Sequence, residues 1–145
     1  MITITRSALL PYTADQMFAL INDIKAYPRF MKGCTGAEIL QQSSDHVTAR
    51  LDLGKAGLYY ALTTRNTLVP GERMDMELLD GPFSHFSAQW RFSQLGEKAC
   101  KVELDMAFEF SAGLLDVPLK KLFESTSRDL VDAVCRQAEQ VYGKS

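Results

Sequence analysis

The region between Gly36 and Ser111 constrains the fold of this chain more than any other feature. Apolar and polar residues alternate there with a period of two, which is typical of strands that bury one face. The alternation is interrupted by turn signals at Ser43-Ser44-Asp45, Gly54 to Gly57, Pro70-Gly71, Asp80-Gly81-Pro82 and Gly96-Glu97-Lys98. Because the segments between these turns leave no room for crossover helices, we expect six successive strands that pair antiparallel as a meander.

The alternation also assigns an apolar and a polar face to four of these strands. The apolar set of the last strand is Cys100, Val102, Leu104, Met106, Phe108 and Phe110. Earlier strands carry the sets Val47, Ala49, Leu51 and Leu53, then Met74, Met76 and Leu78, then Phe86, Ala88, Trp90 and Phe92. A sheet with one apolar face must be covered by another element.

The C-terminal region predicts a long helix that supplies this cover. Apolar residues recur there at helical spacing, namely Leu119, Leu122, Phe123, Thr126, Leu130, Ala133, Val134 and Val141. Asp116 is a candidate N-cap with Pro118 in the first turn, and a helix that already includes Ala112 to Asp116 is the alternative.

The N-terminal residues predict a strand followed by a helix. Ile2 to Leu10 is the predicted strand, and Pro11 ends it because proline has no backbone donor. Thr13 to Gln16 has the form of a capping box, so a short helix is expected to begin near Ala14.

A second short helical segment is predicted before the sheet. Asn22-Asp23 is the predicted break, and Ile24 to Tyr27 are expected to form another helical turn that ends ahead of Pro28. With no repeat or linker in the sequence, we expect a single domain over residues 1–145. Its order is strand, two short helices, six strands and one long helix, an α+β layer with helices on one side of a seven-stranded antiparallel sheet.

Charge and composition exclude several classes of function. The 145 residues include 16 Lys and Arg against 18 Asp and Glu, a net charge of -2, so DNA is not an expected partner. The three cysteines, Cys34, Cys100 and Cys135, are odd in number and lie too far apart in the sequence for a disulfide framework or a zinc site. Unpaired cysteines of this kind are typical of proteins in the reducing cytosol. Apolar runs are much shorter than the roughly 20 residues of a transmembrane helix, and the first residues do not resemble a signal peptide. We therefore expect a cytoplasmic protein.

No catalytic or metal-binding constellation is evident in the sequence. The two histidines, His46 and His85, fall on the predicted outer face, away from any sheltered nucleophile or ligand partner. Gly54 to Gly57 lacks the full spacing of a phosphate-binding loop. The expectation is a protein with no catalytic residues, no metal and no cofactor.

The inner face leaves a choice between a solid core and a ligand cavity. Met74, Met76 and Met106 are soft side chains that adapt to a ligand as readily as they fill a core. Thr64 and Asn66 share a face with apolar residues, so they either find partners in the interior or are hydrated at an open rim. One helix is narrower than seven strands, so the sheet must curl around it, and the curled sheet either packs solid or keeps a hollow.

Motifs along the whole chain resemble one protein family. They are Pro11-Tyr12, Phe18, Asn22-Asp23-Ile24, Tyr27-Pro28, Phe30, Gly33-Cys34, Lys55-Ala56-Gly57, Thr63-Thr64-Arg65-Asn66, Asp80-Gly81-Pro82-Phe83, Trp90-Arg91-Phe92, Cys100 and Phe108-Glu109-Phe110. Their order resembles the bacterial ribosome association toxin A and mitochondrial coenzyme Q-binding proteins of the START-like polyketide cyclase and lipid transport superfamily. The resemblance implies a helix-grip (START-like, Bet v 1-like) fold, in which a curved sheet wraps the C-terminal helix around an apolar tunnel. The absence of an import presequence favours the bacterial branch.

The resemblance implies a non-enzymatic protein that binds a lipophilic small molecule, such as a ubiquinone-like isoprenoid quinone or a lipid, and supports respiratory quinone function. Transient contact with a membrane surface would fit such a carrier. The expected ligand-binding residues are Tyr60, Leu62, Thr64, Asn66, Met74, Met76, Trp90, Phe92, Met106, Phe108 and Phe123.

Two other functions stay open. One is a toxin-like regulator that binds the large ribosomal subunit and blocks subunit association, for which Arg29, Lys32 and Arg65 would form a local basic patch. The other is a polyketide or aromatic cyclase, which requires an acid or base inside the cavity. The sequence leaves the ligand, the oligomeric state and the coexistence of these roles undecided.

Overall fold

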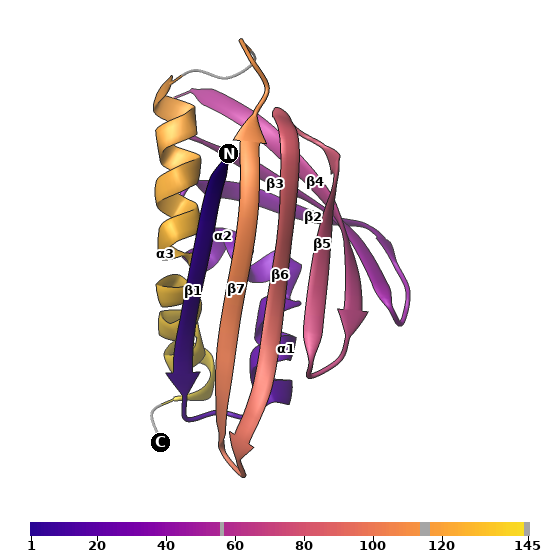
Figure 1. Ribbon diagram of the computed structural model, residues 1–145, viewed down its shortest axis with the longest axis vertical. Helices are drawn as coiled ribbons and strands as arrows, with labels where there is room; N and C mark the ends of the chain where they lie inside the picture. The colour runs from indigo at the N-terminus through magenta and orange to yellow at the C-terminus, as the bar shows by residue number, and fades with distance from the viewer. Residues whose placement is uncertain (56, 114–116, 144–145) are drawn as a thin grey trace.

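The computed structural model describes residues 1–55, 57–113 and 117–143 and is built around a seven-stranded antiparallel sheet (Figure 1). The strands lie in the order β1-β7-β6-β5-β4-β3-β2. Their bounds are Ile2–Leu10 (β1), Cys34–Gln42 (β2), His46–Lys55 (β3), Leu58–Val69 (β4), Arg73–Asp80 (β5), Phe83–Gly96 (β6) and Ala99–Phe110 (β7). The helices are Ala14–Ile21 (α1), Ile24–Ala26 (η1, a 3₁₀ turn), Tyr27–Phe30 (α2) and Val117–Tyr142 (α3). The α+β order predicted from the sequence is confirmed.

The predicted meander is confirmed, and β1 adds a pairing that the alternation did not specify. β2 to β7 pair with their sequence neighbours, whereas β1 pairs antiparallel with β7, with Ile4 opposite Met106. β1 and β2 thus form the opposite edges of the sheet, and residues 11–33, which include α1, η1 and α2, carry the chain from one edge to the other. The sheet curls, so that β2, β3 and β4 run obliquely to β1, β7 and β6 (Figure 1).

The capping box at the start of α1 is present as predicted. The backbone N–H of Gln16 donates to Thr13 Oγ1 over 3.0 Å, and the backbone N–H of Thr13 donates to Gln16 Oε1 over 2.9 Å. These two bonds satisfy donors that the first helical turn leaves without partners, which explains why the helix begins here.

The second helical segment is longer than predicted. The expectation that helix would end ahead of Pro28 is wrong, because α2 runs from Tyr27 through Pro28 to Phe30. Pro28 lies in the first turn of α2, where a backbone N–H has no acceptor within the helix and its loss is tolerated.

The long helix α3 covers the apolar face as predicted, with corrections at its ends. Pro118 lies in its first turn, Ala112 and Gly113 form a turn rather than helix, and the proposed cap Asp116 lies outside the described residues. Val141 was expected on the buried side, but it is 54% exposed. Tyr142 takes the inward position one residue later, where its hydroxyl donates to Gln16 O over 2.7 Å.

An aromatic cluster holds the N-terminal part of α3 against the sheet. Phe123 is 2% exposed, and rings surround it with centroids 4.9 to 6.4 Å away, namely those of Tyr60, Phe83, Phe86, Phe108 and Phe110. At the other end of α3, the Tyr12 hydroxyl donates to Gly143 O and the Tyr12 ring packs on Tyr142. The helix is therefore fastened near both ends.

We expect Phe123→Ala to lower the free energy of unfolding by about 3–5 kcal/mol, because it removes the ring on which the cluster is centred and leaves a cavity. Val141→Ala, on the exposed side of the same helix, should change it by less than about 0.5 kcal/mol. Equilibrium unfolding in urea measures both variants, and equal losses would contradict the packing described for α3.

Candidate functional site

A small apolar cavity lies between the inner face of the sheet, α2 and α3. Water-sized spheres occupy about 40 Å³ of it. Its walls are Tyr27, Met31, Leu51, Leu62, Met76, Phe86, Ala88, Trp90, Leu104, Met106, Phe123, Ser127 and Leu130. The cavity exceeds the 10–15 Å³ that a single water needs, but it is far below the roughly 300–1,000 Å³ of ordinary ligand pockets. The interior is therefore neither solid nor an open tunnel.

The structure brings only part of the predicted ligand-binding set to this cavity. The predicted residues that line it are Leu62, Met76, Trp90, Met106 and Phe123. Tyr60 and Phe108 instead belong to the aromatic cluster around Phe123. Phe92 packs edge-on against Phe18 with ring centroids 5.5 Å apart, and Met74 is 1% exposed but does not reach the cavity wall.

Thr64 and Asn66 lie in the interior, and hydration at an open rim is ruled out. They are 4% and 1% exposed, and the Thr64 hydroxyl donates to Asn66 Oδ1 over 2.9 Å. Each side chain thus gives the other a hydrogen-bonding partner, which lowers the cost of burying them. The pair lies on β4 beyond Leu62, outside the described cavity wall.

Other wall residues were not selected from the sequence. Leu51, Phe86, Ala88 and Leu104 were assigned to the inner face, and Leu130 to the apolar side of the last helix, but nothing distinguished them from ordinary core residues. Tyr27 and Met31 come from α2 and the residue after it, whose position over the sheet is a tertiary feature. Ser127 is 1% exposed and was not selected because serine is polar, although its position four residues after Phe123 and three before Leu130 puts it on the buried side of the helix.

The chemistry of the cavity wall is almost entirely apolar. The Tyr27 hydroxyl donates to Ile21 O over 2.5 Å, and burial raises the pKa of Tyr27 far above its usual range. Among the described wall residues there is no His, Asp or Glu. The wall can therefore hold an apolar group but offers no evident general acid or base at neutral pH.

The outer surfaces hold the histidines and most of the charges. His85 is exposed on β6, and His46 Nδ1 lies 2.9 Å from Asp45 Oδ1, so both histidines stay outside the core as predicted. Arg65 lies on the outer face of β4, whereas Arg29 and Lys32 belong to α2 and the turn that follows it. The structure does not bring these three residues into one basic patch.

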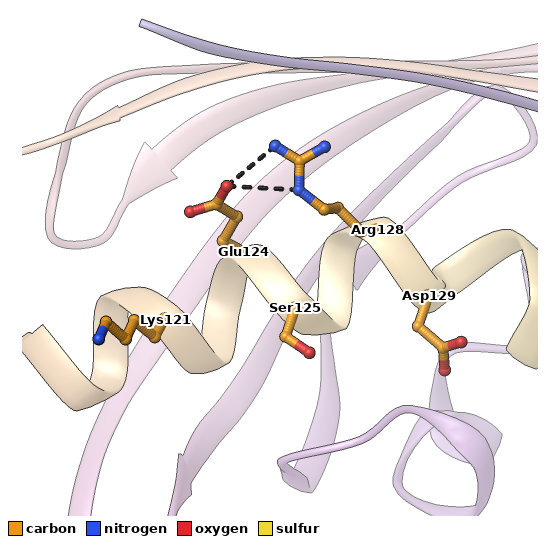
Figure 2. A pocket seen from close by; sticks show the side chains of 5 residues that line it. All are labelled: Lys121, Glu124, Ser125, Arg128 and Asp129. Carbon is orange, nitrogen blue, oxygen red and sulfur yellow. Dashed lines mark hydrogen bonds and ion pairs between the residues drawn. The ribbon is translucent and has the colours of Figure 1, made fainter.

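A shallow hollow of about 420 Å³ lies on the solvent side of α3 (Figure 2). It is lined by Lys121, Glu124, Ser125, Arg128 and Asp129. Arg128 Nη2 and Nε both donate to Glu124 Oε1, over 2.9 and 3.3 Å. Because positive and negative charges alternate along it, this surface presents no strong field of one sign.

The described residues contain neither a cluster of metal ligands nor a membrane-spanning helix. No group of three or more His, Cys, Asp and Glu side chains within them is placed to hold a metal ion. No helix among them is long and apolar enough to cross a membrane.

The fold and sequence match known proteins along nearly the whole chain. Residues 10–135 match the family model described as polyketide cyclase / dehydrase and lipid transport. A Vibrio cholerae protein named ribosome association toxin RatA is 44% identical over 97% of this chain and 98% of its own length. The Xenopus laevis mitochondrial coenzyme Q-binding protein COQ10 homolog B is 24% identical over 97% of this chain and 59% of its own length. The crystal structure of the Zhui aromatase/cyclase from Streptomyces superposes with a TM-score of 0.81 at 22% identity, covering 96% of this chain and 94% of that one.

These matches define the class of protein. The curved seven-stranded sheet around a C-terminal helix is the START-like, Bet v 1-like architecture expected from the sequence. The chain belongs to the polyketide cyclase / dehydrase and lipid transport family and, within it, to the group of ribosome association toxin A proteins.

The reactivity of Cys34, at the start of β2, reports how accessible this side of the interior is to solvent. The side chain is 7% exposed and its Sγ donates to Gly36 O over 3.3 Å. Burial, reinforced by the negative charge of Asp52, raises the pKa of the Cys34 thiol from 9.0 to about 11. At pH 8 the thiolate is then about 0.1% of the population, compared with about 10% for a thiol of ordinary pKa.

We expect Cys34 in the folded protein to react with iodoacetamide about 100-fold more slowly at pH 8 than in urea, because only the thiolate attacks. The native rate should rise about tenfold per pH unit up to about pH 11. Peptide mapping by mass spectrometry follows each cysteine separately. A native rate equal to the denatured rate would show that this side of the interior is open.

Proposed function

We propose that the chain is a non-enzymatic binding protein whose interior accepts a lipophilic small molecule, such as an isoprenoid quinone or a lipid. The observation that carries this proposal is the apolar cavity under α3, with Met31, Met76 and Met106 in its wall. Thioether side chains are unbranched and flexible, so they can rearrange around a guest at lower cost than Leu or Ile. The name of the coenzyme Q-binding relative supports a guest of this class.

The cavity must enlarge to accept such a guest. About 40 Å³ is too little for an isoprenoid chain, so the methionines and the N-terminal part of α3 have to move outward. Burying a few hundred Å² of ligand surface contributes about 25 cal/mol per Å², which offsets part of the cost of opening the aromatic cluster around Phe123. The guest would then lie where Met76, Ala88 and Met106 meet on neighbouring strands.

The wall chemistry favours binding over cyclisation. A cyclase needs a proton donor or acceptor beside its substrate, and Tyr27 already donates to a backbone carbonyl. The solved aromatase/cyclase is 22% identical and supports the shared fold alone.

We expect Met76→Lys to abolish retention of a quinone or lipid, because it puts an ammonium group into the apolar wall. Glu77→Lys, on the exposed face of the same strand, is the matched control and should retain the ligand. Mass spectrometry of organic extracts from purified protein measures retention.

Ala88→Leu provides a second variant that introduces no charge. It fills the space opposite Met76 and should reduce ligand retention while lowering stability by about 1–3 kcal/mol. Wild-type protein that is repeatedly free of any lipophilic molecule would contradict the proposal.

A second function, association with the large ribosomal subunit, is favoured by a different observation. The Vibrio cholerae relative named ribosome association toxin is 44% identical over nearly its full length. We propose on this basis that the chain acts in the cytoplasm as a regulator of ribosomal subunit association. The net charge of -2 implies that any contact with RNA is local rather than driven by a global positive field.

We expect the protein to sediment with large ribosomal subunits in a sucrose gradient at low salt and to leave them as salt increases, because phosphate contacts are screened. Immunoblotting of the fractions gives the distribution. Protein that stays at the top of the gradient at low salt would contradict ribosome association. Met76→Lys in the same gradient shows whether the two proposed functions depend on one another.

A further inference from the structure

Four arginines project from the outer face of the sheet, and three of them are held by carboxylates. Arg50 Nε lies 3.0 Å from Asp52, and Arg73 Nε lies 2.9 Å from Asp75. Arg91 Nη2 lies 2.9 Å from Glu103 and 2.7 Å from Asp105. Arg65, on β4 between β3 and β5, has no carboxylate oxygen within 4.0 Å in the described part of the chain.

The local sequence explains this difference. Arg50 and Arg73 each have an aspartate two residues later, and residues two apart on a strand share a face. The corresponding position after Arg65 is Thr67, which carries no charge. Glu77 is the register partner of Arg65 on β5, but the two side chains form no ion pair. The Arg65 guanidinium is therefore left with its charge uncompensated by direct contact.

Arg65 opens onto a polar hollow of about 180 Å³ beside the β2–β3 hairpin. The hollow is lined by Gln41, Gln42, Ser43, His46, Thr48 and Arg65. The Gln41 and Gln42 amides and the Thr48 hydroxyl lie around one guanidinium, and no carboxylate or apolar residue forms part of the wall. The Ser43 hydroxyl already donates to Asp45 Oδ1 over 3.0 Å. The Asp45 contact at 2.9 Å fixes the orientation of the His46 ring.

This set of groups suits an oxyanion. A guanidinium is a planar donor that matches phosphate oxygens in pairs, and neutral donors around it add hydrogen bonds without requiring a second charge. The volume is below that of a drug-sized pocket and fits a small group rather than a whole cofactor. The Gln41 and Gln42 amides at the rim are suited to the hydroxyls of a sugar.

We propose that this hollow binds a backbone phosphate of an RNA strand, with Arg65 as the charged donor. The inference deepens and rests on the proposed ribosome association. An RNA strand is favoured over a membrane because lipid docking requires exposed apolar side chains, and the wall contains none. A single arginine in this role also agrees with the negative net charge of the chain.

The test is the affinity of the full chain for a fluorescein-labelled oligouridylate, measured by fluorescence anisotropy over a range of salt concentrations. We expect Arg65→Gln to weaken binding about tenfold or more, which corresponds to the loss of a charge-assisted hydrogen bond. The slope of log Kd against log salt should fall by about 0.7, as for one phosphate contact to a single strand. Thr67→Asp should weaken binding while Arg65 is retained, because it places a carboxylate where Arg50 and Arg73 have theirs.

Arg50→Gln is the matched control, since it removes the same charge from a neighbouring strand where Asp52 already pairs with it. It should leave RNA affinity within about twofold of wild type. Equal losses for Arg50→Gln and Arg65→Gln, or no loss for Arg65→Gln, would overturn the proposal. It would also fall if Arg65→Gln reduced binding only to phosphatidylglycerol vesicles or to inorganic phosphate.

Sedimentation with large ribosomal subunits separates this inference from the function on which it rests. If wild type and Arg65→Gln cosediment equally with the subunits, the result supports ribosome association and contradicts a role for the phosphate site in it. If neither cosediments while oligouridylate binding still depends on Arg65, the result supports the phosphate site and contradicts ribosome association.

Discussion

The whole structure depends on one mismatch of size: the apolar face of a seven-stranded sheet must be covered by a single long helix. A helix is about 10 Å across, whereas seven flat strands at about 4.8 Å spacing would span more than 30 Å. The sheet can bury its inner face only by curling around α3, and residues 11–33 fill the side that α3 does not reach. The interior cavity is what this arrangement leaves between a curved surface and a straight cylinder.

The two ends of α3 are held in place by different kinds of contact. Near the start of α3, bulky rings around Phe123 close the space with apolar contacts. Near its end, the Tyr12 hydroxyl donates to Gly143 O and the Tyr142 hydroxyl donates to Gln16 O, which tie this end of the helix to the segment between β1 and α1 and to α1 itself. Apolar packing adapts to a shifted position more readily than hydrogen bonds of fixed length, so the N-terminal part of α3 is where the interior can open. The methionines of the cavity wall lie beneath this adaptable half.

The inner and outer faces of the sheet differ in chemistry, so the two proposed functions would use separate surfaces. The inner face is apolar and encloses a cavity suited to a lipophilic guest, while the outer face carries paired charges and Arg65, which forms no ion pair with a described residue. Because successive residues of a strand point to opposite faces, Asn66 lies in the core while its neighbour Arg65 lies in solvent. Strand β4 therefore contributes one side chain to each surface, because neighbouring residues point to opposite faces.

The sequence by itself determined most elements, the antiparallel meander and the apolar face of β3, β5, β6 and β7, because alternation, turn residues and the Thr13 capping box are local signals. It also determined which side of α3 is buried over most of its length, although Val141 and Tyr142 exchanged roles at the end. Only the tertiary structure decided that β1 pairs with β7, that Tyr27 and Met31 reach the cavity wall, and that Thr64 pairs with Asn66 in the interior. These features depend on contacts between residues distant in the chain or on the curvature of the sheet, and the volume left inside depends on how all the side chains pack at once.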